Sequence, residues 1–301
     1  MIDAEQLASV LADLRLARFV GIEELRGGST AVFRVDLADD TALILKTYDR
    51  AEMVPHREAY ASGLLAAVNV PHPRYLLIDE SLTRLPYRFA LTTYVTGVVG
   101  SAFLAERELF TGIGRLARQL HSVALPGFGA LPEPEYETNA AYISGLANHA
   151  FGRFLEYGAD PVLARSLRAI FERDFASVVL EADRPVFAHD DLHPGNVLVS
   201  GVGAGVSIVG LVDFGNARAS TALMDLAKTI FICEHEMPGI GAAVLAGYGP
   251  IDHPDPEKAL AFYTLLHRVI MWWWLRHIGV LATADAEVDV MSALRVTAAD
   301  G

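Results

Sequence analysis

The stretch Phe187–Gly215 reads FAHDDLHPGNVLVSGVGAGVSIVGLVDFG. A polar cluster, HDDLHPGN, is followed by two β-branched runs, Val197–Val199 and Val206–Val212, which a turn rich in glycine separates. Short runs of this kind, bounded by turn residues, are typical of strands. We therefore expect a polar loop at the open end of a small hairpin, with Asp213 just after its second strand.

The polar residues of this stretch suit phosphoryl transfer. That reaction needs a carboxylate to orient and deprotonate a hydroxyl nucleophile, and oxygen ligands to hold Mg²⁺ on the nucleotide phosphates. Asp191 and Asn196 lie on one short loop and can supply the base and one metal ligand, while Asp213 can supply the other. A turn cap would explain a lone pair of aspartates, but it does not explain the complete pattern.

This pattern resembles the aminoglycoside phosphotransferase and choline kinase family, small-molecule kinases related to protein kinases. The family motif H-x-D-x-H-x-x-N matches His189, Asp191, His193 and Asn196, and Asp213 stands in the D-F-G that follows. The resemblance implies that His189, Asp191 and His193 are catalytic. It also implies that Asn196 and Asp213 hold Mg²⁺.

Asp190 departs from this pattern, because the family often has glycine at that position. Two neighbouring aspartates therefore compete for the role of base. The step of five residues to Asn196 selects Asp191 for it.

The composition limits the remaining classes of function. A chain of 301 residues with 52% apolar and 20% charged side chains is long enough for two lobes with a substantial core. Its net charge of −13 argues against binding to nucleic acid or to an anionic membrane, and it permits a cationic small-molecule acceptor. The single cysteine, Cys233, excludes an internal disulfide.

We expect a cytoplasmic protein. Acidic residues interrupt the N-terminal stretch, so that no signal peptide is predicted. The most apolar later stretch, Leu265–Ala282, contains four basic or histidine side chains and is not predicted to span a membrane.

A glycine-containing turn, residues 26–30, precedes a predicted hairpin and is a candidate nucleotide-binding loop. Alternation in Val32–Leu37 and the run Ala42–Lys46 predict a β-hairpin. The turn before it resembles the nucleotide loop of the family, although it is not G-x-G-x-x-G, and it assigns nucleotide contacts to Gly27, Gly28, Ser29 and Thr30.

Lys46 ends a buried strand, where a lysine needs a partner. Glu58 is the candidate, because Glu58, Ala61 and Leu65 recur at helical spacing on one face of the next helix. Kinase-like enzymes use such a pair to position the lysine on the nucleotide phosphates. Glu52 is a rival partner, and two unpaired surface charges are the plainer alternative.

The segment Thr92–Gly97 looks like the hinge between the lobes that contacts the nucleotide base in the family. Thr93, Tyr94 and Val95 are therefore assigned to nucleotide binding. Side chains contribute little to base recognition at such a hinge, so ATP and GTP both stay open as donors. Beyond Gly97 the periodicity predicts helices over 105–123, 142–157, 161–180 and 221–232.

The last third of the chain carries three further candidates. Asp225 resembles an aspartate that supports the catalytic loop of the family. Glu234 and Glu236 lie where the family builds its acceptor pocket, although solvated charges are the plainer reading. The run Trp272–Trp274 is predicted to be core, with one tryptophan as an alternative sugar-stacking residue.

We therefore expect a protein-kinase-like α+β bilobal fold, with a small β-rich nucleotide-binding lobe over residues 1–95 and a larger helical lobe over 96–301. The expected reaction transfers the γ-phosphoryl of ATP or GTP, with Mg²⁺, to a hydroxyl of a small molecule. An aminoglycoside-type antibiotic is the first choice of acceptor. A metabolic kinase acting on an amino alcohol, homoserine or a sugar-like acceptor is the alternative, and a nucleotide-binding pseudokinase scaffold is the alternative of another class.

Overall fold

The computed structural model describes residues 2–25, 31–50, 54–201, 203–282, 294–295 and 297. By proximity of its Cα atoms the chain forms two compact units, Met1–Leu109 with Pro194–Ala217, and Phe110–His193 with Arg218–Gly301. The first is built on antiparallel strands and the second mainly on helices, so the fold is α+β. The segment 194–217 belongs to the first unit although it follows the helices in sequence. The lobe boundary at residue 95 stays a prediction.

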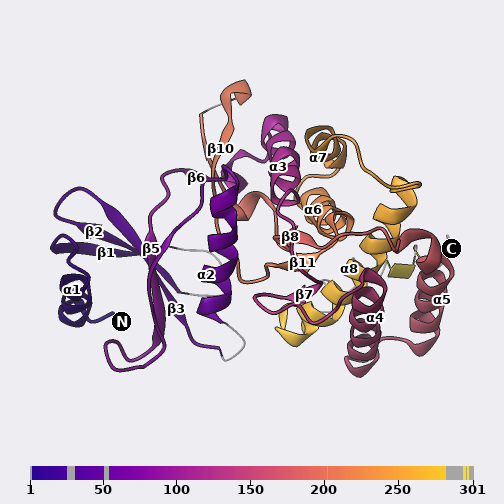
Figure 1. The fold of residues 1–301 in the computed structure, drawn as a ribbon, viewed down its shortest axis with the longest axis horizontal. Helices are drawn as coiled ribbons and strands as arrows, with labels where there is room; N and C mark the ends of the chain where they lie inside the picture. The colour runs from indigo at the N-terminus through magenta and orange to yellow at the C-terminus, as the bar shows by residue number, and fades with distance from the viewer. Residues whose placement is uncertain are drawn as a thin grey trace. The chain divides into compact units, whose positions relative to one another are not determined.

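A five-stranded antiparallel sheet of order β1-β2-β3-β5-β4 forms the body of the first unit (Figure 1). Its strands are β1 (Phe19–Leu25), β2 (Val32–Leu37), β3 (Ala42–Tyr48), β4 (Tyr75–Asp79) and β5 (Arg88–Thr93). The predicted hairpin is present as β2 and β3, with Val32 opposite Lys46. Its alternation buries Val35 and Leu45, which share a core with Leu7 of helix α1 (Ala4–Asp13).

Helix α2 (Pro55–Leu64), continued by the 3₁₀ turn Leu65–Ala67, presents the face that the spacing predicted. Glu58, Ala61 and Leu65 are buried, at 4%, 0% and 0% exposure. Burial of a carboxylate on that face requires donors around it, because an unpaired buried charge is costly.

The stretch 187–215 contains the predicted hairpin. Strands β9 (Val197–Ser200) and β10 (Ser207–Leu211) are antiparallel, and β6 (Val98–Val99) adds to the free edge of β9. The 3₁₀ turns Gly100–Phe103, Pro194–Asn196 and Gly203–Gly205 lie beside these strands in sequence. Gly97 and Gly210 permit a close approach, since a Cβ on Gly210 would lie 2.7 Å from Val95 Cγ1 and one on Gly97 2.9 Å from Leu198 Cβ. The hinge segment therefore packs directly on the hairpin.

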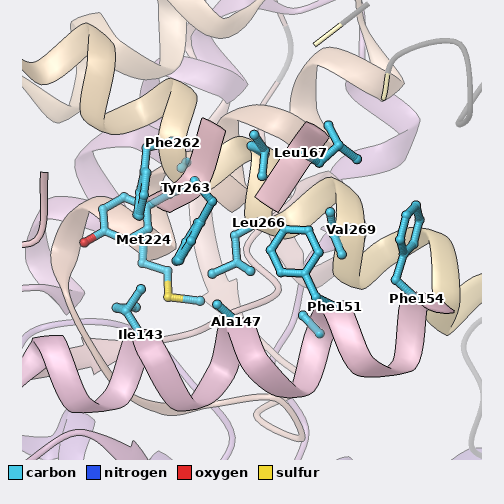
Figure 2. Packing of buried hydrophobic residues seen from close by; sticks show 14 of the residues in the cluster. Ile143, Ala147, Phe151, Phe154, Leu167, Met224, Phe262, Tyr263, Leu266 and Val269 are labelled. Atoms are coloured by element: carbon cyan, nitrogen blue, oxygen red, sulfur yellow. The ribbon is translucent and has the colours of Figure 1, made fainter. Parts of the chain in front are cut away.

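The second unit is organised around helix α8 (Pro256–His277), which packs against three other helices. The helices of this part are α3 (Arg107–Leu120, whose first turn belongs to the first unit), α4 (Asn139–Glu156), α5 (Pro161–Val178), α6 (Ala222–Glu236) and α7 (Gly241–Tyr248), and the 3₁₀ turn Val280–Ala282 follows α8. In Figure 2, Ile143, Ala147, Phe151 and Phe154 follow one face of α4 toward the apolar side chains of α8. This spacing of three to four residues is that of an amphipathic helix facing a core.

A small sheet of order β7-β11-β8 holds the start of the loop that carries the motif His189–Asn196. Its strands are β7 (Gly129–Ala130), β8 (Val186–Ala188) and β11 (Arg218–Ser220). Ala188 pairs with Arg218, so the loop that begins at His189 leaves the sheet beside Arg218.

The three tryptophans of the run Trp272–Trp274 on α8 differ in burial. Trp272 is fully buried with its ring centroid 4.7 Å from that of Phe154, and Trp273 is partly buried. Trp274 is 38% exposed, so the prediction that the whole run is core is wrong for this residue. Three consecutive helical positions span about 200° of the helix circumference, so they cannot all face one core. No helix among the described residues has the length and apolar character needed to cross a membrane.

Candidate active site

Lys46 is held by two carboxylates of the first unit. Its Nζ lies 3.1 Å from Glu58 Oε1 and 2.9 Å from Glu58 Oε2, and 3.1 Å from Asp213 Oδ1. The Lys46 and Glu58 side chains are 14% and 5% exposed, whereas that of Asp213 is 47% exposed. Burial acts to lower the pKa of Lys46, but the charges of Glu58 and Asp213 outweigh it and the pKa is raised, so the ammonium stays charged.

Two tyrosines complete the surroundings of Glu58. The hydroxyls of Tyr75 and Tyr48 donate to Glu58 Oε2 at 2.8 and 3.3 Å. Burial and the Glu58 charge both raise the pKa of each phenol, so both tyrosines remain donors. The Glu58 carboxylate therefore has three donors, and the lysine that it holds points to the end of the hairpin where Asp213 lies. Glu52, the rival partner, lies outside the described residues.

Asn196 and Asp213 come together at the open end of the β9–β10 hairpin. The amide of Val212 donates to the carbonyl of Asn196 at 3.0 Å, one residue before Asp213. Asp213 has a backbone φ of 65°, in the left-handed region, which turns its carboxylate out of the strand direction. Asn196 is 9% exposed.

This donor set fits Mg²⁺ better than a metal that needs a complete protein cage. Mg²⁺ is usually bound by one or two carboxylates together with phosphate and water oxygens. In the parts of the chain that the structure describes, no group of three or more His, Cys, Asp or Glu side chains could hold a metal ion alone. A carboxylate and a carboxamide residue at the same end of a hairpin are the pattern expected when substrate phosphates supply the remaining ligands.

The predicted hinge residues lie at the end of β5 and directly after it. Thr93 Oγ1 accepts a hydrogen bond from the Arg74 amide at 2.9 Å, and the Tyr94 ring lies under the guanidinium of Arg34 at 4.8 Å. Val95 contacts the hairpin at Gly210. The predicted nucleotide-loop residues, Gly27, Gly28, Ser29 and Thr30, lie outside the described residues.

The loop that begins at His189, predicted to be catalytic, is held by Asp225 of α6. The amide of His189 donates to Asp225 Oδ2 at 3.2 Å, and that of Asp190 to Asp225 Oδ1 at 2.7 Å. His121 Nε2 lies 2.9 Å from Asp225 Oδ2, and its Nδ1 lies 2.9 Å from the hydroxyl of Tyr248. Burial would raise the pKa of Asp225, but the hydrogen bond and charge of His121 and the other donors outweigh it, and the pKa is lowered. The predicted support by Asp225 is thus present.

The two neighbouring aspartates of the loop differ in their surroundings. Asp190 is 6% exposed, and its carboxylate contacts Arg218 Nε at 2.8 Å and Lys228 Nζ at 3.3 Å. Asp191 is half-buried. Both oxygens of the Asp190 carboxylate are already contacted by a cation, so the side chain has little room to contact an acceptor hydroxyl. The surroundings therefore favour Asp191 over Asp190 as the base, as the spacing does.

The two acidic acceptor candidates, Glu234 and Glu236, also differ in their contacts. His193 Nδ1 lies 3.1 Å from Glu236 Oε1, and both side chains are 23% exposed. Glu234 instead accepts hydrogen bonds from the amides of Gly239, at 2.7 Å, and Gly241, which begins α7. Glu234 is therefore a helix-capping residue, which leaves Glu236 as the acidic candidate beside the catalytic motif.

Sequence reasoning missed His121, Arg218 and Lys228. Lys228 had a weak signal, because it lies three residues after Asp225 and so shares its helix face. His121 contacts Asp225 from a helix distant in sequence, and Arg218 contacts Asp190 from a neighbouring strand, so only the fold reveals either contact.

Solved structures with the same fold share low sequence identity with this chain. One is a thermostable mutant of aminoglycoside phosphotransferase APH(4)-Ia in a ternary complex with ADP and hygromycin B (16% identity, 97% of each chain covered, TM-score 0.74). A putative fructosamine-3-kinase from Thermobifida fusca YX-ER1 matches at 18% identity, covering 98% of this chain and 99% of its own, with TM-score 0.67. A Plasmodium vivax ethanolamine kinase matches at 12% identity, covering 92% of this chain and 81% of its own, with TM-score 0.62.

These likenesses show that the α+β fold is the protein-kinase-like fold of small-molecule kinases. No curated protein sequence matches the chain. The family model described as the phosphotransferase enzyme family (APH) matches residues 21–262. This match covers most of the chain and both of its units, and the chain therefore belongs to the phosphotransferase enzyme family.

Proposed function

We propose that this protein is a small-molecule O-kinase that transfers the γ-phosphoryl group of ATP or GTP to a hydroxyl group of its acceptor. The contact that carries the proposal is the triad of Lys46 with Glu58 and Asp213. A buried lysine bound by a deeper carboxylate and by a more exposed one is arranged to meet phosphate oxygens on its open side.

In the proposed reaction Asp191 orients the acceptor hydroxyl and accepts its proton. The hydroxyl oxygen forms a bond to the γ-phosphorus, and the bond from that phosphorus to the bridging oxygen breaks, releasing the nucleoside diphosphate. Lys46 neutralises charge on the nucleotide phosphates, and Glu58 keeps the ammonium in place. His189 and His193 belong to the same loop, and the Glu236 contact orients the His193 ring.

Asn196 and Asp213 are the residues that would hold Mg²⁺. When bound, the ion would neutralise charge on the transferred phosphoryl group and on the leaving group. The hinge residues Thr93, Tyr94 and Val95 would contact the base, and Gly27, Gly28, Ser29 and Thr30 would contact the phosphates.

The first choice of acceptor is an aminoglycoside-type or related antibiotic, whose phosphorylation would inactivate it. The net charge of −13 and the acidic side chain of Glu236 beside the catalytic motif support a cationic acceptor. One named structural relative is an aminoglycoside phosphotransferase with hygromycin B bound.

A metabolic acceptor is the second candidate, and one observation favours it. Glu234 is committed to the start of α7, so the acidic surface available to a polycation is smaller than the sequence implied. A neutral or zwitterionic hydroxyl compound, such as an amino alcohol or a sugar derivative, needs fewer carboxylates. Named structural relatives include a putative fructosamine-3-kinase and an ethanolamine kinase.

A phosphorylation screen tests the proposal. The purified protein is incubated with Mg²⁺ and either ATP or GTP over aminoglycosides, macrolides, amino alcohols, homoserine and ketosamines, and diphosphate release and acceptor mass are measured. Acceptor-dependent gain of one phosphoryl group, lost in Asp191→Asn, is the expected result. Nucleotide binding with no turnover on any acceptor would instead favour the pseudokinase scaffold.

A further inference from the structure

Asp190 occupies a backbone conformation that side chains rarely adopt. Its φ is 54°, in the left-handed region where glycine is favoured and other residues need additional contacts to hold them. The residue is also 6% exposed, so its charge is largely removed from water. An aspartate in this position is unfavourable on both counts unless the surrounding structure binds it.

Both peptide groups that flank Asp190 are bound from α6. Its amide donates to Asp225 Oδ1 at 2.7 Å, which fixes the peptide group that joins it to His189. Its carbonyl accepts a hydrogen bond from Lys228 Nζ, which fixes the peptide group that joins it to Asp191. The backbone is therefore held on each side of the residue that precedes the proposed base.

The Asp190 carboxylate connects the same lysine to a second element. Its Oδ1 lies 3.3 Å from Lys228 Nζ, and its Oδ2 lies 2.8 Å from Arg218 Nε on β11. The side chains of Lys228 and Arg218 are 15% and 31% exposed, so neither cation is fully solvated, and the charge of Asp190 raises the pKa of Arg218. Removal of the carboxylate would leave two cations close together and would release the lysine from its place under the carbonyl.

We infer that Asp190 is a positioning residue, whose carboxylate holds Lys228 and Arg218 so that the peptide group leading into Asp191 keeps one orientation. This inference rests on the proposed function, in which Asp191 is the base. It assigns the two adjacent aspartates different tasks: the buried one fixes the backbone and the half-buried one acts on the acceptor hydroxyl. Small displacements of a catalytic group are costly, because proton transfer requires hydrogen-bond distance to the nucleophile.

Two substitutions of Asp190 separate charge from backbone preference. Asp190→Asn keeps the shape and removes the charge, and Asp190→Gly also removes the conformational strain. We expect each to lower kcat by about tenfold, with the KM for the nucleotide within about twofold of the unsubstituted protein. The nucleotide candidates Lys46 and Glu58 belong to the other unit, and these variants change neither of them.

Asp174 provides a matched control in the same unit. Its carboxylate also lies between an arginine and a lysine, 2.8 Å from Arg173 Nη2 and 3.0 Å from Lys258 Nζ, and its side chain is 13% exposed. Asp174→Asn removes the same kind of charge from α5 and is expected to leave kcat unchanged. A loss of kcat specific to the Asp190 variants therefore reports the position in the loop and not the loss of an ion pair.

Hydrogen exchange gives a readout that needs no acceptor. The amides of His189 and Asp190 are bound to Asp225, and we expect their exchange to quicken by about tenfold or more in both Asp190 variants, but not in Asp174→Asn. Wild-type kcat and unchanged exchange in Asp190→Asn and Asp190→Gly, beside an inactive Asp191→Asn, would overturn the inference and leave the proposed function standing. An active Asp191→Asn would overturn the proposed function itself.

Discussion

Two charged clusters among the described residues are built with opposite stoichiometry. In the first unit one cation, Lys46, is shared by two carboxylates, Glu58 and Asp213. In the second unit one carboxylate, Asp190, is shared by two cations, Arg218 and Lys228. In each unit the buried carboxylate is contacted by several donors and has a more exposed carboxylate near it. For Glu58 this is Asp213, which shares Lys46, and for Asp190 it is Asp191, the next residue.

The difference shows how burial divides tasks between like residues. Glu58, with its side chain 5% exposed, and Asp190, with its side chain 9% exposed, are held by several donors and are suited to fixing the geometry of their neighbours. Asp213, 47% exposed, and Asp191, half-buried, retain access to ligands from solvent. On this comparison, exposure distinguishes the residues proposed to meet Mg²⁺ or acceptor from those proposed to support them.

The largest expected effect is that of the proposed base, and it tests the comparison in the second unit. Asp191→Asn should lower kcat by about 10²–10⁴-fold with little change in nucleotide affinity, because it removes the proton acceptor alone. Asp190→Asn should lower kcat far less. Steady-state kinetics and calorimetry with nucleotide measure both. If the two variants ranked in reverse, the motif would be assigned one residue out of place.

Metal dependence tests the exposed carboxylate of the first unit. Asp213→Ala and Asn196→Ala should each weaken binding of the Mg-nucleotide by about tenfold or more, because each removes an oxygen ligand from a hard cation. Calorimetry over a series of Mg²⁺ concentrations measures this loss. Unchanged affinity and turnover in both variants would exclude the assigned metal site.

The buried carboxylate of the first unit should act only through its lysine. The losses in kcat/KM from Lys46→Ala and Glu58→Ala should therefore be non-additive, with an interaction energy of about 1–3 kcal/mol in a double-mutant cycle. Tyr75→Phe, which removes one donor to Glu58 and leaves the ion pair, is the matched control and should cost less. Simple addition of the two losses would remove Glu58 from its proposed role.

The residues of this site differ in how far the sequence predicted them. Asp191, Asn196 and Asp213 were predicted because they stand in two short motifs that follow each other in one stretch of sequence. The partnership of Lys46 with Glu58 followed from strand and helix periodicity. Both depend on local geometry, which a sequence carries directly.

The contacts of Asp190 depended on the fold. Arg218 reaches the loop because β11 pairs with β8, and Lys228 reaches it because α6 places one face under the loop. Neither pairing leaves a periodic signal. The same holds for Glu234, which was predicted as an acceptor candidate but binds the start of α7. Local patterns were therefore enough to nominate the residues that we propose to be reactive, whereas the contacts that support them required the tertiary structure.

A buried histidine behind α6 should make the stability of the second unit sensitive to mild acid. His267 is 3% exposed, its Nε2 lies 2.9 Å from the carbonyl of Met224, and burial lowers its pKa to about 4. Because the unfolded chain binds a proton near pH 6.5 and the folded one does not, stability is present above pH 6.5 and is lost as the pH falls toward 4. We expect a loss of about 1 kcal/mol between pH 7.5 and 5.5 from this residue. His267→Gln keeps a donor for Met224 and should flatten that part of the profile in urea unfolding; an identical slope in both proteins would contradict the assignment.

The smallest expected effect concerns the acceptor, and it asks whether exposed acidic groups attract it. Charges at exposed sites are screened over a Debye length of about 8 Å at physiological salt, whereas buried pairs are screened much less. If the acceptor is a polycation, its KM should rise severalfold as KCl is raised, because Glu236 and the acidic surface lose their attraction. The KM of the nucleotide should respond less steeply, since Lys46 is buried and paired.

Glu236→Gln should reduce the salt dependence of the acceptor KM, with Glu234→Gln as a control that alters a helix cap instead. Kinetics from low to high KCl, with the acceptor that the screen identifies, measure both quantities. An acceptor KM that stays flat over this range would exclude electrostatic attraction and favour the neutral or zwitterionic hydroxyl compound, whose recognition would then rest on hydrogen bonds and shape.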